Sequence, residues 1–429
     1  MIQVYKYPER KGWAELLKRP ALDYQKLSNQ VGQILSDIKA NGDEAVLKYT
    51  QKFDNYRLPS LEVLIDELDV NDIAVSGPLK NAIDTAINNI SAFHRIQKES
   101  VNHIETSPGV LCWRKSVAIE KVGLYIPGGS APLFSTLLML AIPAGIAGCK
   151  EIIVCTPSNE EGNINPAILY AAKQTGISKI YKIGGAQAIG AMAYGTQTIP
   201  KVYKIFGPGN QYVTCAKMLV NTEGVSIDMP AGPSEVAMLV DENCIPSFVA
   251  ADLLSQAEHG QDSQVILISP SENIIKEVVR CLEEQLEKLP RKDIAKMALK
   301  NSKAILVHDI NEGINLVNEY APEHLIICCE DEDIVAERII NAGSVFIGNY
   351  TPESAGDYAS GTNHTLPTNG FARAYSGLSL DSFIKKITFQ KITPEGLSIL
   401  APTIMEMANA EGLQAHANAV SIRLKTNEI

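Results

Sequence analysis

The sequence lacks a surplus of positive charge: 38 Lys and Arg residues stand against 49 Asp and Glu residues, which gives a formal net charge of −11. A basic surface for phosphate backbones is therefore not expected, and we predict no nucleic-acid partner. The first residues, 1–11, contain no apolar stretch of the kind found in secretory signals, so the expected compartment is the cytoplasm. Low-complexity tracts and repeats at a solenoid period are also absent.

Charged residues are missing between Lys121 and Lys150, a stretch long enough to cross a bilayer as a helix. Several helix-interrupting residues argue against that reading, because lipid would leave the freed backbone groups unpaired: Pro127, Gly128, Gly129, Pro132 and Pro143. We predict a buried strand, turn and helix here, and no membrane segment. The eight cysteines lack CxxC spacing and lie mostly in apolar runs, which predicts reduced core residues.

The pattern of apolar residues predicts an α/β protein. Up to about residue 105 the periodicity is helical, as in 24–49 and 78–99. Short apolar or β-branched runs then alternate with helical segments, and the predicted strands are 122–126, 151–155, 180–183, 202–206, 236–240, 265–268, 304–307, 325–328 and 344–347. Such alternation indicates parallel sheets covered on both faces. Two sheets are expected, with a boundary near Gly232-Pro233, and from Ser382 the chain is expected to be helical again.

Glycine-rich loops follow three of the predicted strands, at 123–132, 184–190 and 206–211. Backbone N–H groups at such strand-to-helix junctions favour anions, and glycine lets a phosphate approach the main chain. None of the loops is a GxGxxG or GxxxxGK[ST] motif, so the usual dinucleotide and NTP fingerprints are missing. A nucleotide site and a set of ordinary tight turns are both consistent with this pattern.

Four histidines stand beside other chemically capable side chains. Gln256 and His259 are spaced by one helical turn, which suits either a metal site or a plain helix end before Gly260. Asp357 and His364 lie in a long segment, 352–367, that is rich in turn residues and short of helix formers. Long loops inside compact domains are usually functional, and we favour that interpretation.

Two further acid–imidazole pairs are weaker signals. Glu323 and His324 are successive residues before a predicted strand, which would send one inward and one outward. Glu411 and His416 would lie about 140° apart on an ideal helix. They converge only if Gly412 breaks the helix or if the tail packs on another surface; otherwise His416 is a packing residue. The segment 413–424 is too small to hold a core alone and should pack elsewhere, with a second subunit as one candidate.

Longer motifs, in order along the chain, make a specific match. They are Gly-Leu-Tyr-Ile-Pro-Gly-Gly at 123–129, Gly-Gly-Ala-Gln-Ala-Ile at 184–189, Ile-Phe-Gly-Pro-Gly-Asn at 205–210, Ala-Gly-Pro-Ser-Glu at 231–235, Gln-Ala-Glu-His-Gly at 256–260, Glu-Tyr-Ala-Pro-Glu-His-Leu at 319–325, Gly-Asp-Tyr-Ala-Ser-Gly-Thr-Asn-His-Thr-Leu-Pro-Thr at 356–368 and Glu-Gly-Leu-Gln-Ala-His at 411–416. This series resembles the histidinol dehydrogenase family from about residue 25 to the C-terminus.

The resemblance implies two incomplete Rossmann-like parallel-sheet domains with small helical extensions at both ends. It implies an N-terminal arm at 1–20, a first α/β domain from 21–120 with 235–380, and a second, NAD-binding domain at 121–234. Residues 381–429 would form a tail on the partner subunit of a homodimer with shared active sites.

The resemblance also implies a chemistry: oxidation of L-histidinol to L-histidine with NAD and one zinc ion per subunit. The implied zinc ligands are Gln256, His259, Asp357 and His416, and all four would also contact substrate. Further substrate contacts are Ser234, Glu323, His324, His364 and Glu411, with Glu411 and His416 supplied by the partner. The implied NAD contacts are Tyr125, Gln187 and Asn210.

Within that scheme His324 is expected to take the alcohol proton and Glu323, assisted by His324, to activate water for the second oxidation. Rival functions are a related dehydrogenase of another small amino alcohol or diol, a zinc hydrolase with Glu323 as base, and a catalytically silent sensor. The hydrolase would leave the three glycine-rich loops without a purpose.

Overall fold

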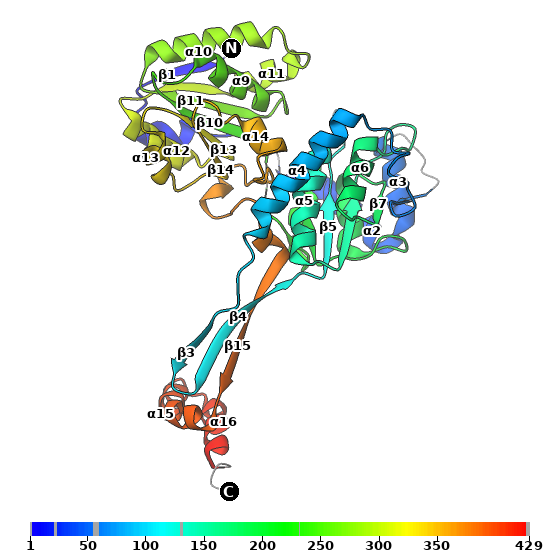
Figure 1. The fold of residues 1–429 in the computed structure, drawn as a ribbon, viewed down its shortest axis with the longest axis vertical. Helices are drawn as coiled ribbons and strands as arrows, with labels where there is room; N and C mark the ends of the chain where they lie inside the picture. The colour runs from blue at the N-terminus through cyan, green and yellow to red at the C-terminus, as the bar shows by residue number, and fades with distance from the viewer. Residues whose placement is uncertain (1, 21–23, 55–59, 129–131, 231, 426–429) are drawn as a thin grey trace. The chain divides into compact units, whose positions relative to one another are not determined.

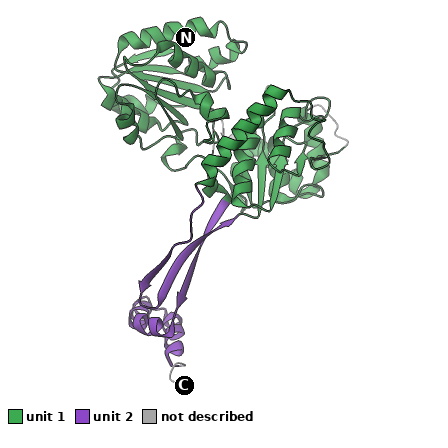
Figure 2. Cartoon of the chain, in the orientation of Figure 1, with its two compact units in different colours: residues 1–96, 119–383 green, residues 97–118, 384–429 purple. Residues whose placement is uncertain are grey.

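The computed structural model of the chain describes residues 2–20, 24–54, 60–128, 132–230 and 232–425, and Figure 1 shows their course. The described residues form two compact units (Figure 2): unit 1 comprises 1–96 and 119–383, and unit 2 comprises 97–118 and 384–429. Unit 1 holds two six-stranded sheets, and unit 2 holds a three-stranded sheet.

Sheet 1, in unit 1, has the strand order β2-β7-β6-β5-β8-β9. In that order its strands are Glu62–Leu64, Lys179–Tyr181, Glu151–Cys155, Lys121–Tyr125, Lys204–Phe206 and Ser226–Ile227. All neighbours are parallel except β2 and β7. Counted from β5, the parallel part has the order 3-2-1-4-5, which is a Rossmann sheet without its sixth strand.

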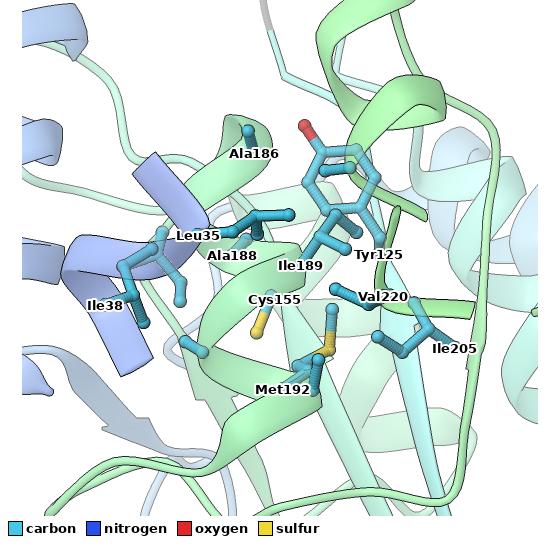
Figure 3. Packing of buried hydrophobic residues seen from close by; sticks show 14 of the residues in the cluster. Leu35, Ile38, Tyr125, Cys155, Ala186, Ala188, Ile189, Met192, Ile205 and Val220 are labelled. Atoms are coloured by element: carbon cyan, nitrogen blue, oxygen red, sulfur yellow. The ribbon is translucent and has the colours of Figure 1, made fainter. Parts of the chain in front are cut away.

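Helices cover both faces of sheet 1, which explains why its central strands are apolar throughout. One face carries α2 (Tyr24–Asn41), α3 (Asp43–Asp54), α7 (Gly185–Tyr194) and α8 (Gln211–Thr222). The other carries α4 (Gly77–Arg95), α5 (Phe134–Ala147) and α6 (Pro166–Gln174). Figure 3 shows Leu35 and Ile38 of α2 against α7. This approach needs Gly190, because a Cβ there would lie 2.9 Å from Ile38 Cδ1.

Sheet 2, also in unit 1, is parallel throughout, with the order β1-β12-β11-β10-β13-β14. In that order its strands are Gln3–Lys6, Lys303–Leu306, Gln264–Ser269, Glu235–Val240, His324–Cys328 and Ser344–Ile347. From β10 onward the order is again 3-2-1-4-5, and β1 is added at the edge. The N-terminal segment therefore contributes a strand to this sheet.

Helices also cover both faces of sheet 2. One face carries α9 (Pro246–Ala257), α10 (Glu272–Leu286) and α11 (Lys292–Lys300). The other carries α1 (Trp13–Leu16), α12 (Ile310–Tyr320) and α13 (Glu332–Glu337). A short helix, α14 (Glu353–Tyr358), follows β14, and single 3-10 turns lie at Arg10–Gly12, Phe371–Arg373 and Leu380–Phe383.

Unit 2 contains an antiparallel sheet and two helices. The strand order is β15-β4-β3, with bounds Ile384–Ile392, Val110–Ala118 and His103–Ser107. The helices α15 (Pro394–Ala410) and α16 (Gln414–Lys425) pack against each other. Gly412 has a φ of +74°, a left-handed conformation that ends α15 and turns the chain into α16.

Much of the predicted architecture is confirmed. All nine predicted strands are present, and the boundary at Gly232-Pro233 separates the strands of sheet 1 from those of β10 onward. The stretch from Lys121 to Lys150 forms β5 and α5, as expected, and among the described residues we find no helix with the length and apolarity needed to span a membrane. All eight cysteines are free thiols.

Other parts of the prediction differ from the structure. The helical pattern at 24–49 forms two helices, α2 and α3, separated near Gly42, whose φ is +55°. The tail after Ser382 was expected to be helical, but it begins with the strand β15, which pairs with β4. Residues 21–120 were grouped with 235–380, whereas α2, α3 and α4 bury their apolar faces on sheet 1. Helical periodicity reveals that a face is apolar but not which sheet it covers.

Candidate active site

An acid and an imidazole are held side by side at the start of β13. The backbone N–H of Glu235 donates to Glu323 Oε2 at 2.9 Å, and Gln256 Nε2 donates to the same oxygen at 3.4 Å. His324 Nδ1 lies 3.3 Å from Gln256 Nε2, which can only donate, and 3.4 Å from the Glu235 carbonyl oxygen, which can only accept, so the two contacts belong to opposite ring tautomers. Both Glu323 and His324 are buried, so the pattern expected of a strand, with one buried and one exposed, is wrong here.

Burial sets the protonation of this pair. It lowers the pKa of His324 to about 3, so the imidazole is neutral near pH 7. It raises the pKa of Glu323 well above its usual range, and the negative charges of Glu235 and Asp357 add to this effect, while the hydrogen bond from Glu235 opposes it. An acid with a raised pKa is a stronger base once it is deprotonated.

A second group of ligand-type side chains lies next to this pair. Possible ligand atoms of His259, Glu353 and Asp357 all lie within 4.8 Å of one another. Asp357 Oδ1 is also 3.8 Å from His324 Nε2. Burial raises the pKa of Asp357 to about 7 and that of Glu353 well above its usual range. Asp357 was expected on a loop, but it lies on α14, one turn after Glu353.

Glu353 is the residue that sequence reasoning missed. It is fully buried, and neither carboxylate oxygen has a hydrogen-bond partner among the described residues. The signal that could have found it is the spacing from Glu353 to Asp357, which places two carboxylates on one face of a helix. The turn residues of this segment predict a loop, and in a loop such a spacing would not place the two carboxylates on one face.

His364 links this group to sheet 1. Its Nδ1 donates to the Asp357 carbonyl at 2.9 Å, and the Thr136 hydroxyl, from the first turn of α5, lies 3.1 Å from its Nε2. Burial lowers the pKa of His364 to about 4. Ser234 lies directly before β10, next to Glu235, and is half-buried.

The two predicted tail residues belong to unit 2. Glu411 follows the last residue of α15 and His416 lies in the first turn of α16, and both side chains are exposed. The expected break at Gly412 is present. His416 does not belong to the buried face of α16, which consists of Ala417 and Val420, so a packing role for His416 is not supported.

The predicted cofactor residues line one cavity of about 1650 Å³ at the carboxyl edge of sheet 1. The backbone N–H of Gly185, at the start of α7, donates to the Tyr125 hydroxyl at 3.1 Å. Gln187 is buried with an unpartnered Oε1, and Asn210 caps α8 by accepting hydrogen bonds from the next turn. Two helix N-termini therefore lie beside the cavity, an arrangement that suits anionic groups.

The loop after β8 must approach β5 closely to form this cavity. Gly207 has a φ of +123°, and a Cβ on it would lie 2.1 Å from the Tyr125 carbonyl oxygen. Only glycine fits this position. The glycine-rich loop after β5 is described only as far as Gly128, so Gly129 and the two residues after it lie outside the described residues, as does Ala231 of the motif at 231–235.

The side chains fit a divalent cation. Zinc in proteins takes imidazole nitrogen and carboxylate oxygen, which His259, Asp357 and Glu353 offer within a small volume. Gln256 Oε1 is buried without a partner, as are both oxygens of Glu353. Unpartnered buried acceptors and carboxyl groups with raised pKa values are costly alone, and a cation among them would offset that cost.

The sequence model of the histidinol dehydrogenase family matches residues 17–424. A histidinol dehydrogenase from Bacteroides thetaiotaomicron is 60% identical over 99% of this chain and 100% of its own length. A chloroplastic histidinol dehydrogenase from Arabidopsis thaliana is 51% identical over 96% of this chain and 89% of its own length. The crystal structure of histidinol dehydrogenase from Elizabethkingia anophelis matches with a TM-score of 0.96 and 55% identity, covering 100% of this chain and 99% of that one.

Proposed function

The chain belongs to the histidinol dehydrogenase family, and from this membership we propose that it oxidises L-histidinol to L-histidine by way of the bound aldehyde, with reduction of two NAD⁺. It is an oxidoreductase of histidine biosynthesis. The two-step proposal rests on the buried pair Glu323 and His324. In this pair a carboxyl group and a neutral imidazole lie next to each other.

The two oxidations need two proton transfers, and the pair supplies a group for each. His324 takes the alcohol proton in the first step, since its ring is neutral and its buried Nε2 has no hydrogen-bond partner among the described residues. Glu323, assisted by His324, takes a proton from the water that adds to the aldehyde. The contacts of Glu323 with Glu235 and Gln256 hold the carboxyl group in place for that task.

We propose that Gln256, His259 and Asp357 hold a zinc ion together with His416 of the partner subunit. When bound, this ion would act as a Lewis acid that orients the amine and imidazole of the substrate. Support comes from the unpartnered Gln256 Oε1 and the closeness of His259 to Asp357. Glu353 adds a carboxylate next to these ligands.

Substrate contacts complete the proposal. Ser234 and His364 from the same chain, with Glu411 of the partner subunit, would bind histidinol beside Glu323 and His324. The hydrogen bond of His364 to Thr136 supports this arrangement, because it ties the substrate-binding histidine to the first turn of α5.

NAD would bind in the cavity of sheet 1 and supply the hydride acceptor. Tyr125, Gln187 and Asn210 would contact it, and the N-termini of α7 and α8 suit its pyrophosphate. The half-Rossmann order of sheet 1 supports this, since dinucleotides bind at the carboxyl edge of such sheets.

The test is an assay of the purified chain with histidinol, NAD and zinc, in which NADH and histidine are both quantified. We expect two NADH per histidine and no accumulation of free aldehyde. One NADH per histidinol with released aldehyde would contradict the two-step proposal, and turnover of another amino alcohol in preference to histidinol would favour the rival substrate.

We also propose a homodimer that shares its active sites, located in the cytoplasm. Glu411 and His416 are both exposed in unit 2, which supports the shared site, because exposed side chains are free to contact residues of a second subunit. Sedimentation analysis tests the dimer, and a monomer that is fully active would refute it. Cell fractionation tests the location.

A further inference from the structure

The cavity of sheet 1 contains a carboxylate that the proposed function does not use. Asp54, the last residue of α3, lines this cavity together with Tyr125 and Gln187. Its Oδ2 is buried and has no hydrogen-bond partner among the described residues. Its negative charge adds to the raised pKa of Tyr125, whose main cause is burial.

Two further residues of the cavity lining also have a buried side-chain oxygen without a hydrogen-bond partner among the described residues. Thr156 and Gln187 are almost completely buried, and Thr156 Oγ1 and Gln187 Oε1 have no partner in the described part of the chain. A buried polar atom without a partner costs free energy that a bound donor would recover. The wall thus calls for a ligand with several hydrogen-bond donors, such as hydroxyl and amine groups.

The charges around the cavity argue against an additional phosphate at this wall. The lining includes four carboxylates and two amines: Asp54, Asp69, Asp72, Glu160, Lys52 and Lys182. No arginine is among the described residues of the lining. Burial raises the pKa of Asp54, and no neighbouring cation of the described residues counteracts this effect.

We propose that Asp54 selects the cofactor: its carboxylate accepts a hydrogen bond from a free ribose hydroxyl of NAD and repels a cofactor with a phosphate on that hydroxyl. This inference rests on the proposed function. An acidic residue that reads the ribose is a common device of Rossmann sheets, where it follows the second strand. Here the loop after the corresponding strand, β6, carries Glu160 and Glu161, which are both exposed, and of these two Glu160 lines the cavity; the buried acceptor comes from α3 instead.

Calorimetric titration of the purified chain with NAD and with NADP tests the inference without turnover. Asp54→Asn keeps the shape of the side chain and removes its charge. We expect it to weaken NAD binding by about tenfold, the effect of exchanging a charged hydrogen-bond acceptor for a neutral one. NADP binding should strengthen, because the like charge is gone, so the preference for NAD should fall by at least about tenfold.

Two control variants remove the same charge from other positions in the lining. Asp69→Asn alters an exposed carboxylate whose Oδ1 already accepts hydrogen bonds from Asn71, and Glu160→Gln alters the acid of the loop after β6 that lines the cavity. Both should leave the preference for NAD within about twofold of the parent value. Melting curves of all variants verify that they are folded.

Each result decides between clear alternatives. The inference is overturned if the parent binds NADP as tightly as NAD, if Asp54→Asn leaves the preference unchanged, or if a control shifts it equally. An unchanged preference together with NAD-dependent oxidation of histidinol refutes the role of Asp54 alone. An Asp54-dependent preference in a chain that does not oxidise histidinol refutes the proposed function and leaves the inference standing.

Discussion

A buried ion pair that holds the loop after β8 gives a prediction with a defined magnitude. Lys217 of α8 and Asp228 form an ion pair with side chains only 4% and 1% exposed. Lys217 Nζ also donates to the Gly207 carbonyl at 2.8 Å, and Asp228 Oδ2 accepts from the Gly207 N–H at 2.8 Å. The pair therefore binds both backbone polar groups of the residue whose left-handed conformation forms the loop before Asn210.

Replacing Lys217 by methionine leaves the Asp228 charge buried without its counterion. Loss of one partner of a buried pair costs about 3–5 kcal/mol of unfolding free energy. The double variant Lys217→Met/Asp228→Asn removes both charges, so its cost should be at least about 2 kcal/mol smaller than the sum of the two single costs. Because the loop before Asn210 loses its anchors, NAD affinity should fall as well.

The assay is urea unfolding followed by far-ultraviolet circular dichroism. Tryptophan emission is unsuitable, since Trp13 packs on sheet 2 and Trp113 lies on β4 of unit 2. Lys39→Met is the matched control, because Lys39 and Glu223 form an exposed pair on the same sheet, and its loss should cost less than about 1 kcal/mol. A Lys217→Met variant within about 1 kcal/mol of the parent, or additive costs in the double variant, would refute the reasoning.

Three further predictions concern the active site. His324→Gln should slow both oxidations by about 10²–10⁴-fold, whereas Glu323→Gln should slow mainly the oxidation of supplied aldehyde; stopped-flow measurement of each step shows whether the losses differ. Mixtures of inactive His416→Ala and His259→Ala subunits should regain activity and zinc after reassembly, and no recovery would count against a shared site. Asp357, with its pKa raised to about 7 in the metal-free chain, stabilises the fold at low pH and loses this contribution as the pH rises through about 7. Metal-free protein should therefore lose stability relative to Asp357→Asn as the pH rises from about 4 to about 7, and zinc should restore it most at the upper end; melting curves with a chelator and with zinc test this.

The architecture was largely predictable because its signals are local. Strands in parallel sheets are buried on both faces, so their apolar runs can be recognised one by one along the chain. The boundary at Gly232-Pro233 was visible because strand and helix alternation restarts after it. β15 was missed because exposed side chains give an antiparallel strand no apolar run: seven of its nine residues are exposed.

The residues of the candidate site could be predicted only where they belong to the motifs of the resemblance. The resemblance named Gln256, His259 and Asp357, and the structure brings them together with Glu323 and His324. These five residues come from three segments that are distant in the sequence, so no spacing rule connects them.

The sequence by itself determined the α/β class, the two sheets and the family, because periodicity and motifs are properties of consecutive residues. Only the tertiary structure decided which sheet α2, α3 and α4 cover, that Glu353 lies beside His259 and Asp357, and that Asp54 lines the cavity at sheet 1. The reason is burial. A helix can bury its apolar face on any sheet of suitable shape, and a carboxylate acquires its raised pKa and its lack of partners only from residues that folding brings around it.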